Sequence, residues 1–254
     1  LKKNIKFRII EFVNNKLPKL KNDIYLLDVK YKFTKPFESI SAKSKNYISK
    51  SFEIGLKIIN LKLSNLLING PISKKYFLNY KYPGITEYIF KKSDIKNSKK
   101  PVMLIFNKEF SVSPITTHIS LKEVPKNINK EIIASNIEEI NEFYKTKLNI
   151  KPRIAVLGLN PHCESKFKNN EERLKIIPAI KKLKKRNIKV DGPFSADTFF
   201  QKKNIKKYDT VVGMYHDQVL TPFKTIFGFN ASNVTLGLPF LRMSVDHGPN
   251  ETML

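Results

Sequence analysis

The sequence predicts an α/β fold with a mostly parallel or mixed sheet. Short apolar runs bounded by turn residues alternate with segments whose apolar residues recur every three or four positions. With 254 residues, 41% of them hydrophobic, the chain can bury a sizeable core. It contains no internal repeat or low-complexity linker, so we treat residues 1–254 as a single domain with no lobe boundary visible in the sequence.

Three segments have helical patterns. Apolar residues recur at three- and four-residue spacing over 44–61, and they follow one face of 130–148. Residues 171–186 begin with two glutamates and end with basic residues, and both ends complement the helix dipole. We expect Pro178 to kink this third helix.

Strands are predicted where short apolar runs meet turn residues. They are expected within residues 24–29, 63–68, 102–106, 153–159, 188–190 and 210–218. Residues 110–117 are a candidate hairpin partner for 102–106, and residues 5–13 fit either a helix or a strand. The turn Asn69-Gly70-Pro71 follows one of these strands, and the carboxyl ends of strands are where α/β sheets bind ligands.

The net charge of +25 raises the possibility of a nucleic-acid partner. Of the 47 basic residues, however, only five are arginine, and the lysines spread along the whole chain beside many Ile and Asn residues. AT-rich codon usage produces the same bias, whereas nucleic-acid sites favour clustered arginine with interleaved aromatic residues. We therefore expect no nucleic-acid partner, and keep a basic nucleic-acid-binding protein as an alternative.

The remaining composition favours a cytoplasmic protein. A single cysteine, Cys163, forbids an internal disulfide and fits a reducing compartment. No apolar run approaches the roughly 18 residues of a membrane span, so no membrane partner is expected. The chain begins with Leu and stops soon after its densest motif, which suggests a fragment.

The densest polar cluster lies in residues 214–248. It holds two histidines, two aspartates, Lys224, Asn233 and Arg242, separated by short apolar runs that are typical of strands. Lysine and arginine bind phosphate or carboxylate, and arginine does so with a bidentate fork. No G-x-G-x-x-G, P-loop or G-x-S-x-G motif is present.

Three of the four histidines, His118, His162 and His216, each follow a predicted strand. Three neutral imidazoles with an open fourth position make a catalytic Zn²⁺ site, although spacings this long have little specificity of their own. Cys163 could be a fourth ligand or a nucleophile, but a small buried side chain is the simpler interpretation.

Several motifs, in this order, resemble the 4-hydroxythreonine-4-phosphate dehydrogenase family of vitamin B6 (pyridoxine and pyridoxal phosphate) biosynthesis. The resemblance runs from about residue 41 to residue 248. The motifs are NGPISK (69–74), YPGITE (82–87), TTHISL (116–121), GLNPHC (158–163), GPFSADTFF (192–200), MYHDQ (214–218) and NVTLGLPFLRMSVDHG (233–248).

This resemblance implies a fold like that of isocitrate and isopropylmalate dehydrogenases, with two lobes and a cleft. It also implies a homodimer whose active site lies at the subunit interface. A divalent metal (Zn, Mg or Co) would be held by His118, His162 and His216.

The family's substrate contacts fall on Thr86, Lys224, Asn233 and Arg242. The turn Asp246-His247-Gly248 resembles the dinucleotide-binding loop of the wider dehydrogenase group, which binds NAD or NADP without a Rossmann fingerprint.

The implied reaction oxidises 4-phosphohydroxy-L-threonine to 2-amino-3-oxo-4-phosphooxybutanoate, which loses CO2 to give 3-amino-2-oxopropyl phosphate. Asp217 and Lys224 are both candidates for the catalytic group that accepts the proton. Related substrates, such as a phosphothreonate, a phosphoerythronate or a dihydrodiol acid, remain an alternative.

The sequence departs from the family pattern at several places. Ile85 replaces the usual His of G-H-T-E, so one polar contact to substrate is lost. Pro249-Asn250 replaces a small Thr-Ala pair after the DHG turn, and ESKFKNN (164–170) replaces a Gly-rich segment. The family's opening strand and its C-terminal segment are missing. An inactive relative of the family is therefore a further alternative.

Overall fold

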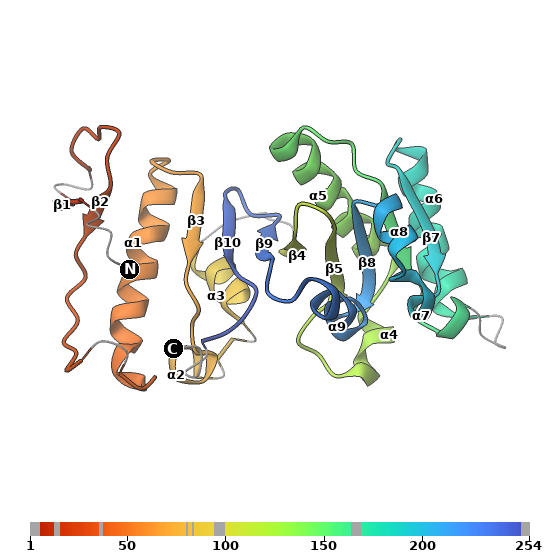
Figure 1. Ribbon diagram of the computed structural model, residues 1–254, viewed down its shortest axis with the longest axis horizontal. Coiled ribbons are helices and arrows are strands. Elements are labelled where there is room, and N and C mark those ends of the chain that lie inside the picture. Colours follow the sequence, from red (N-terminus) through yellow and green to blue (C-terminus); the bar gives the residue numbers. More distant parts are fainter. Residues whose placement is uncertain are drawn as a thin grey trace.

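The chain folds around one eight-stranded mixed sheet (Figure 1). The computed structural model describes residues 6–12, 16–35, 38–79, 81–82, 84–93, 100–163 and 169–249. The strand order is β3-β10-β9-β4-β5-β8-β6-β7. These strands span Leu66–Asn69 (β3), Val102–Phe106 (β4), Ser111–Thr116 (β5), Ile154–Leu157 (β6), Val190–Phe194 (β7), Thr210–Tyr215 (β8), Ser232–Leu236 (β9) and Leu241–Val245 (β10).

Pairing is parallel at both ends of the sheet and antiparallel in the middle. The strand β10 runs parallel to β3 but antiparallel to β9, and β9 and β5 both run antiparallel to β4. The strands β5, β8, β6 and β7 are parallel neighbours. The predicted fold class and the predicted β4–β5 hairpin are therefore confirmed.

Two short strands, β1 (Arg8–Ile10) and β2 (Tyr25–Leu27), pair in parallel outside the main sheet. The ambiguity of residues 5–13 is thus resolved in favour of a strand, although Ile5 and Val13 lie outside the described residues. The prediction of a strand within 24–29 is confirmed.

Helices cover both faces of the sheet (Figure 1). One core cluster joins the sheet to α5 and α6, a second joins it to α7, α8 and α9, and a third packs α1, α2 and α3 around Phe52, Phe77 and Tyr88. The bounds are Lys45–Asn60 (α1), Lys74–Leu78 (α2), Ile85–Lys92 (α3), Val124–Asn127 (α4), Lys130–Leu148 (α5), Ile177–Lys185 (α6), Ala196–Phe199 (α7), Lys202–Lys207 (α8) and His216–Phe227 (α9).

The helix α5 has the bounds that the sequence predicts. The side chain of Asn129 caps its start by accepting a hydrogen bond from the Ile132 amide, and Asn149 ends it in a left-handed conformation. Its buried face includes Ile133, Ile137 and Ile140, each fully excluded from solvent.

The predicted helix 171–186 differs from a simple kinked helix. Its first part, Glu172–Ile176, is a π-helical turn, and the α-helix begins only at Ile177. Pro178 has no amide hydrogen to donate, so a regular hydrogen-bond ladder cannot run through this position. Here the chain accommodates the proline by widening the preceding turn rather than by ending the helix.

One prediction for residues 214–248 is wrong. Residues 216–227 form the helix α9 rather than a turn followed by a strand-like run. The apolar residues Val219, Leu220 and Phe223 fall on one helical face and are buried, and Pro222 lies inside the helix. The rest of the segment does form strands, β9 and β10.

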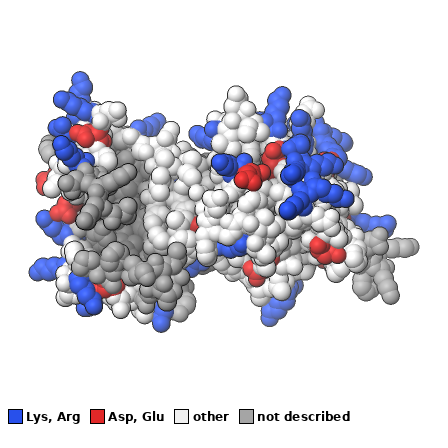
Figure 2. Space-filling view, in the orientation of Figure 1, with Lys and Arg blue, Asp and Glu red and all other residues white. Residues whose placement is uncertain are grey.

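Basic side chains gather over α6 and α8 (Figure 2). These two helices carry eight lysines, Lys181, Lys182, Lys184, Lys185, Lys202, Lys203, Lys206 and Lys207. The buried residues of α6 are the apolar Ala179, Ile180 and Leu183. The lysines therefore form a solvated face opposite the core. Within the described ranges, no helix is long and apolar enough to cross a membrane.

Candidate functional site

A polar cavity of about 170 Å³ lies where four strands end at their carboxyl sides. The ends of β3, β5, β8 and β10 deliver Asn69, His118, His216 and Asp246 to its wall. Open α/β sheets bind ligands at this edge. Of the predicted site residues, the cavity brings together Thr86, His118, His216, Asn233, Arg242, Asp246, His247 and Gly248.

His216 is the first residue of α9 and lies beside Asp217. Its Nδ1 donates a hydrogen bond to the Asp217 carboxylate at 2.7 Å, because an ionised carboxylate can only accept. This contact leaves the Nε2 lone pair free to bind an ion. A carboxylate behind a histidine is the arrangement that orients and strengthens metal-binding imidazoles.

His118 has similar surroundings. Its Nδ1 lies 3.9 Å from the Glu87 carboxylate, and its Nε2 accepts a hydrogen bond from the Lys74 ammonium at 3.3 Å. Burial raises the pKa of Glu87, but the neighbouring His118 imidazole and the Lys74 charge outweigh it and hold that pKa below its usual value. The lone pair of His118 thus already faces a positive charge.

The rings of His118 and His216 are close enough to share one ion. Their centroids lie 6.1 Å apart. A Zn–N bond of about 2.0–2.1 Å places an ion about 3.2 Å from a ring centroid, so the separation of these two rings lies within the span of two such bonds. Two imidazoles are suitable donors for a divalent metal, which would replace the Lys74 ammonium at His118 Nε2.

The third histidine, His162, does not line this cavity. It is exposed, in the short turn Pro161–Cys163, and has a left-handed backbone with φ of 59°. Across the part of the chain that the structure describes, no three His, Cys, Asp or Glu side chains meet closely enough to hold a metal ion. One chain alone therefore does not bring together the three predicted ligands.

The turn that carries His162 is held by a buried carboxylate. Glu172, from the π-helical turn, accepts hydrogen bonds from the amides of Leu159 and Asn160, both at 2.8 Å, and from the Asn160 side chain at 2.9 Å. Glu172 is only 1% exposed. Cys163 also has a positive φ, so two successive residues adopt a conformation that costs energy in non-glycine residues.

Arg242 lies in the floor of the cavity and is almost fully buried. Its guanidinium donates hydrogen bonds to Asn69 Oδ1 at 2.9 Å and to the hydroxyls of Thr235 and Thr86 at 3.3 and 3.5 Å. Burial lowers its pKa to about 10, partly opposed by the Glu87 charge. Neutral hydroxyl and amide partners leave most of its positive charge uncompensated, which suits a bound anion.

Lys224 stands behind this cavity rather than in its wall. Its Nζ donates to the Asp246 carbonyl at 3.0 Å and lies 3.4 Å from the Asp246 carboxylate. The Asp246 side chain is 1% exposed. Neither of its carboxylate oxygens has a hydrogen-bond partner, and the same holds for Asn233 Oδ1 and Glu87 Oε2. Buried oxygens without hydrogen-bond partners are costly, so these atoms are suited to a ligand that donates hydrogen bonds, even though Asp246 also pairs electrostatically with Lys224.

Comparison with known proteins agrees with this geometry. The family model "Pyridoxal phosphate biosynthetic protein PdxA" matches residues 1–250. The chain belongs to this family.

Curated members of the PdxA family are similar to the chain. It is 40% identical to the 4-hydroxythreonine-4-phosphate dehydrogenase of Sulfurihydrogenibium sp. over 90% of this chain and 70% of that protein. It is 39% identical to the enzyme of Bradyrhizobium diazoefficiens over 72% of this chain and 54% of that protein. The matched regions thus cover 54% to 70% of the length of these relatives.

The fold also matches solved PdxA structures. A 4-hydroxythreonine-4-phosphate dehydrogenase from Klebsiella pneumoniae superposes with a TM-score of 0.76 at 27% identity, covering 97% of this chain and 76% of that one. The family's named enzymes are oxidoreductases of pyridoxal phosphate biosynthesis, as the sequence motifs predict. The comparisons do not favour the nucleic-acid-binding alternative.

Sequence reasoning missed two charged residues of this PdxA site, Glu87 and Lys74. Lys74 and Glu87 are the last residues of the motifs NGPISK and YPGITE, but nothing in the local spacing indicates that both meet His118. Ile85 does line the cavity, so the departure from G-H-T-E replaces a polar group with an apolar one inside the site. The replaced segment 164–168 and Asn250 lie outside the described residues.

Proposed function

We propose that this chain oxidises 4-phosphohydroxy-L-threonine with NAD or NADP and a divalent metal, as part of vitamin B6 biosynthesis in the cytoplasm. One observation carries the proposal beyond family membership: a single cavity places a buried arginine beside two carboxylate-backed histidines. The arginine would hold an anionic group and the metal held by the histidines would activate a hydroxyl, and a phosphorylated hydroxy amino acid has both groups.

The residues that would hold the substrate's anionic ends are Arg242, Asn233 and Thr86, with Lys224 behind them. Arg242 offers a planar set of donors that stays charged at neutral pH. Its position is fixed by Asn69 and Thr235, so little side-chain entropy is lost on binding. The Asn233 and Asp246 oxygens without partners would accept hydrogen bonds from the substrate's ammonium or hydroxyl groups.

His118, His216 and His162 would hold the divalent metal, and the turn Asp246-His247-Gly248 would contact the dinucleotide. When bound, the metal lowers the pKa of the substrate hydroxyl and the nicotinamide accepts hydride. Asp217 and Lys224 remain the candidates for the proton acceptor. The cavity is lined by side chains from β3, β4, β9 and β10.

We further propose that His162 serves the site of a second copy of the chain in a homodimer. In one copy it is exposed and lies outside the cavity wall, while its turn is held rigidly by Glu172. A residue fixed in a strained, outward conformation is suited to a partner's site. The site would then be complete only at the interface between subunits.

Mixing two inactive variants tests both proposals. His118→Ala and His162→Ala should each lose metal binding and NAD reduction. In a refolded equimolar mixture, half of the random dimers should be hybrids, and each hybrid has one complete site and one site that lacks both histidines. About a quarter of all sites should therefore be complete, and the activity should recover to about a quarter of that of the native chain. No recovery, with both variants folded and dimeric, would contradict a shared site. Activity retained by His118→Ala would contradict the metal site itself.

The nearest rival is the same chemistry on a phosphothreonate or phosphoerythronate. This alternative substrate class is worth testing because Ile85, an apolar residue, lines the cavity where the family has histidine. NAD reduction should be compared on 4-phosphohydroxy-L-threonine and on a phosphothreonate, with the native chain and with Ile85→His. We expect the native chain to prefer the amino acid, and Ile85→His to lower its KM.

A further inference from the structure

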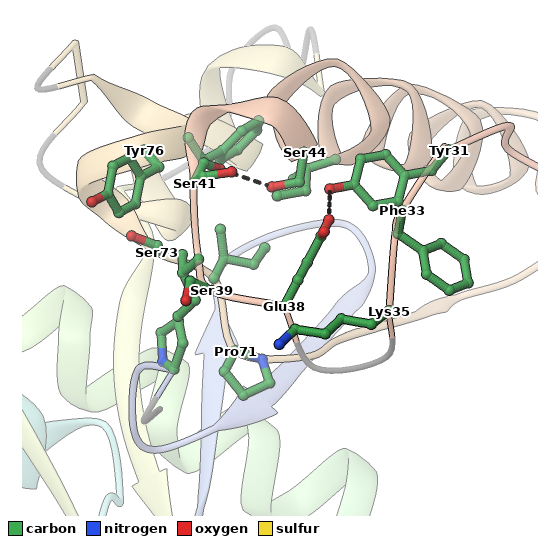
Figure 3. A pocket seen from close by; sticks show the side chains of 15 residues that line it. Tyr31, Phe33, Lys35, Glu38, Ser39, Ser41, Ser44, Pro71, Ser73 and Tyr76 are labelled. Carbon is green, nitrogen blue, oxygen red and sulfur yellow. Dashed lines mark hydrogen bonds between the residues drawn. The ribbon is translucent and has the colours of Figure 1, made fainter. Parts of the chain in front are cut away.

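A second cavity, of about 320 Å³, lies beside the first (Figure 3). It is formed by the segment between β2 and α1, by the turn between β3 and α2, by residues of α1 and α2, and by Pro249 in the turn after β10. Its wall consists of Tyr31, Phe33, Lys35, Glu38, Ser39, Ile40, Ser41, Ser44, Ile48, Pro71, Ile72, Ser73, Tyr76, Phe77 and Pro249.

The two cavities share a wall. Pro71 and Ile72 line both of them. The turn after β10 also touches both, because Gly248 lines the first cavity and Pro249 lines the second. A molecule that filled the second cavity would therefore reach the first beside the same turn.

The second cavity combines aromatic, hydroxyl and charged groups. Tyr31 and Phe33 lie stacked with centroids 6.3 Å apart and an interplanar angle of 21°. Glu38 points into the cavity (Figure 3) and accepts hydrogen bonds from the hydroxyls of Tyr31 and Thr34 at 3.1 and 3.0 Å. These hydroxyls, Thr34 foremost, hold the pKa of Glu38 below its usual value, so the carboxylate is charged at neutral pH.

Lys35 is the one basic residue in this wall, and in Figure 3 its side chain extends across the cavity toward Pro71. The same view shows the hydroxyls of Ser41 and Ser44 on one side and Ser73 and Tyr76 on another. These aromatic, hydroxyl and charged groups suit a ligand that combines an aromatic ring, hydroxyls and an anionic group.

We propose that this cavity binds the adenosine half of the dinucleotide, and that Glu38 selects NAD over NADP. The inference rests on the proposed dehydrogenase function. The first cavity, at about 170 Å³, suits a small substrate, whereas the second lies at the lower end of the 300–1,000 Å³ typical of ligand sites.

Each group has a role in this arrangement. The adenine ring would stack on the exposed Phe33, and the Glu38 carboxylate would accept hydrogen bonds from the ribose hydroxyls. A carboxylate in this position favours a free 2′-hydroxyl and repels a 2′-phosphate. Lys35 would pair with the pyrophosphate, whose nicotinamide end passes Pro71 and Ile72 toward His118 and Arg242.

The test measures binding directly, by calorimetry with NAD, NADP and adenosine monophosphate. Phe33→Ala should weaken NAD and adenosine monophosphate roughly 10-fold, the loss expected for one base–aromatic stack. Phe7→Ala is the matched control, since Phe7 and Phe33 are 52% and 61% exposed and Phe7 lies outside the cavity wall. Glu38→Gln keeps the acceptor for Tyr31 and should reduce the preference for NAD over NADP.

The outcomes separate this inference from the proposed function. If NAD binds and responds to Phe33→Ala and Glu38→Gln while no substrate is oxidised, the cavity assignment stands and the proposed function fails. If substrate is oxidised but both variants leave the NAD dissociation constant and the NAD:NADP ratio unchanged, the assignment is overturned. A rise in the KM for NAD, with the KM for substrate unchanged, supports it.

Discussion

The imidazole of His216 donates a hydrogen bond to the carboxylate of its chain neighbour Asp217 at 2.7 Å. The contact lies at the start of α9, so the first two residues of that helix form a pair in which one orients the other. The Asp217 side chain is 79% exposed, so this bond adds little to the stability of the fold. Its consequence is a fixed ring orientation.

Asp217→Asn should therefore weaken metal binding about 10- to 100-fold, the usual effect of losing a carboxylate behind a metal-binding histidine. The amide can still accept from Nδ1, but it lacks the negative charge. Zn²⁺ binding by calorimetry checks this. Glu131→Gln, at another acidic residue in the first turn of a helix, is the control and should leave the affinity unchanged.

Arg242→Lys should raise the KM for a phosphorylated substrate at least about 10-fold while leaving metal affinity unchanged. An ammonium cannot donate simultaneously to Asn69, Thr86 and Thr235 in the planar geometry of a guanidinium. Steady-state kinetics together with Zn²⁺ binding separate the two effects. An unchanged KM would show that the anion binds elsewhere.

Glu172→Ala should lower the free energy of unfolding by about 2–5 kcal/mol, because it leaves the Leu159 and Asn160 amides without an acceptor. Glu172→Gln keeps one oxygen and should cost less. If the turn positions His162 for a partner, Glu172→Gln should also weaken metal binding by the dimer. The loss in the free energy of metal binding should then be larger than the loss in the free energy of unfolding. Urea unfolding and metal titration of the same samples distinguish a structural role from a positioning role.

Tyr144 should make the fold sensitive to high pH. Burial raises its pKa to about 12, and its hydroxyl donates to Ser111 and to the Asp209 carbonyl. The folded-state pKa lies above the unfolded value of about 10, so the stabilisation is complete below pH 10 and disappears as the pH rises toward 12. This term amounts to at most about 2–3 kcal/mol.

Tyr144→Phe removes this pH-dependent contribution to the free energy of unfolding. Its free energy of unfolding should lie below that of the native chain at pH 8, and the difference should shrink between pH 10 and 12. Unfolding curves at these three pH values test it. A constant difference would place the titrating group elsewhere.

The sequence predicts elements well where one local signal dominates. The strand β4 and the helix α5 have the predicted bounds, because each is a continuous apolar run or a single periodic face with a clear cap. The sequence does not predict the helix α9, because Pro222 interrupts the helical pattern of its apolar residues. Pro178 predicts an irregularity in the helix 171–186, but the sequence does not specify that the irregularity is a π-helical turn before the proline.

The sequence indicates which residues belong to the candidate site, but it indicates only in part which of them lie close together. Strand ends indicate that His118, His216 and Arg242 approach one edge of the sheet, and the cavity brings these three together. Glu87 and Lys74 act on His118 through tertiary contacts that no spacing encodes. The position of His162 relative to the other histidines depends on assembly, which one sequence does not specify.

The placement of β10 between β3 and β9 has a consequence for how the molecule folds. This strand is the last of the described strands along the chain, yet it pairs with β3, which is the first strand of the eight-stranded sheet in chain order. Until it inserts, β3 has no neighbour and both β3 and β9 present open edges that can pair with another chain. Such long-range pairing is slow. During synthesis, the β3–β10–β9 side of the sheet, which carries Arg242, would therefore be the last part of the sheet to form and the most prone to aggregation.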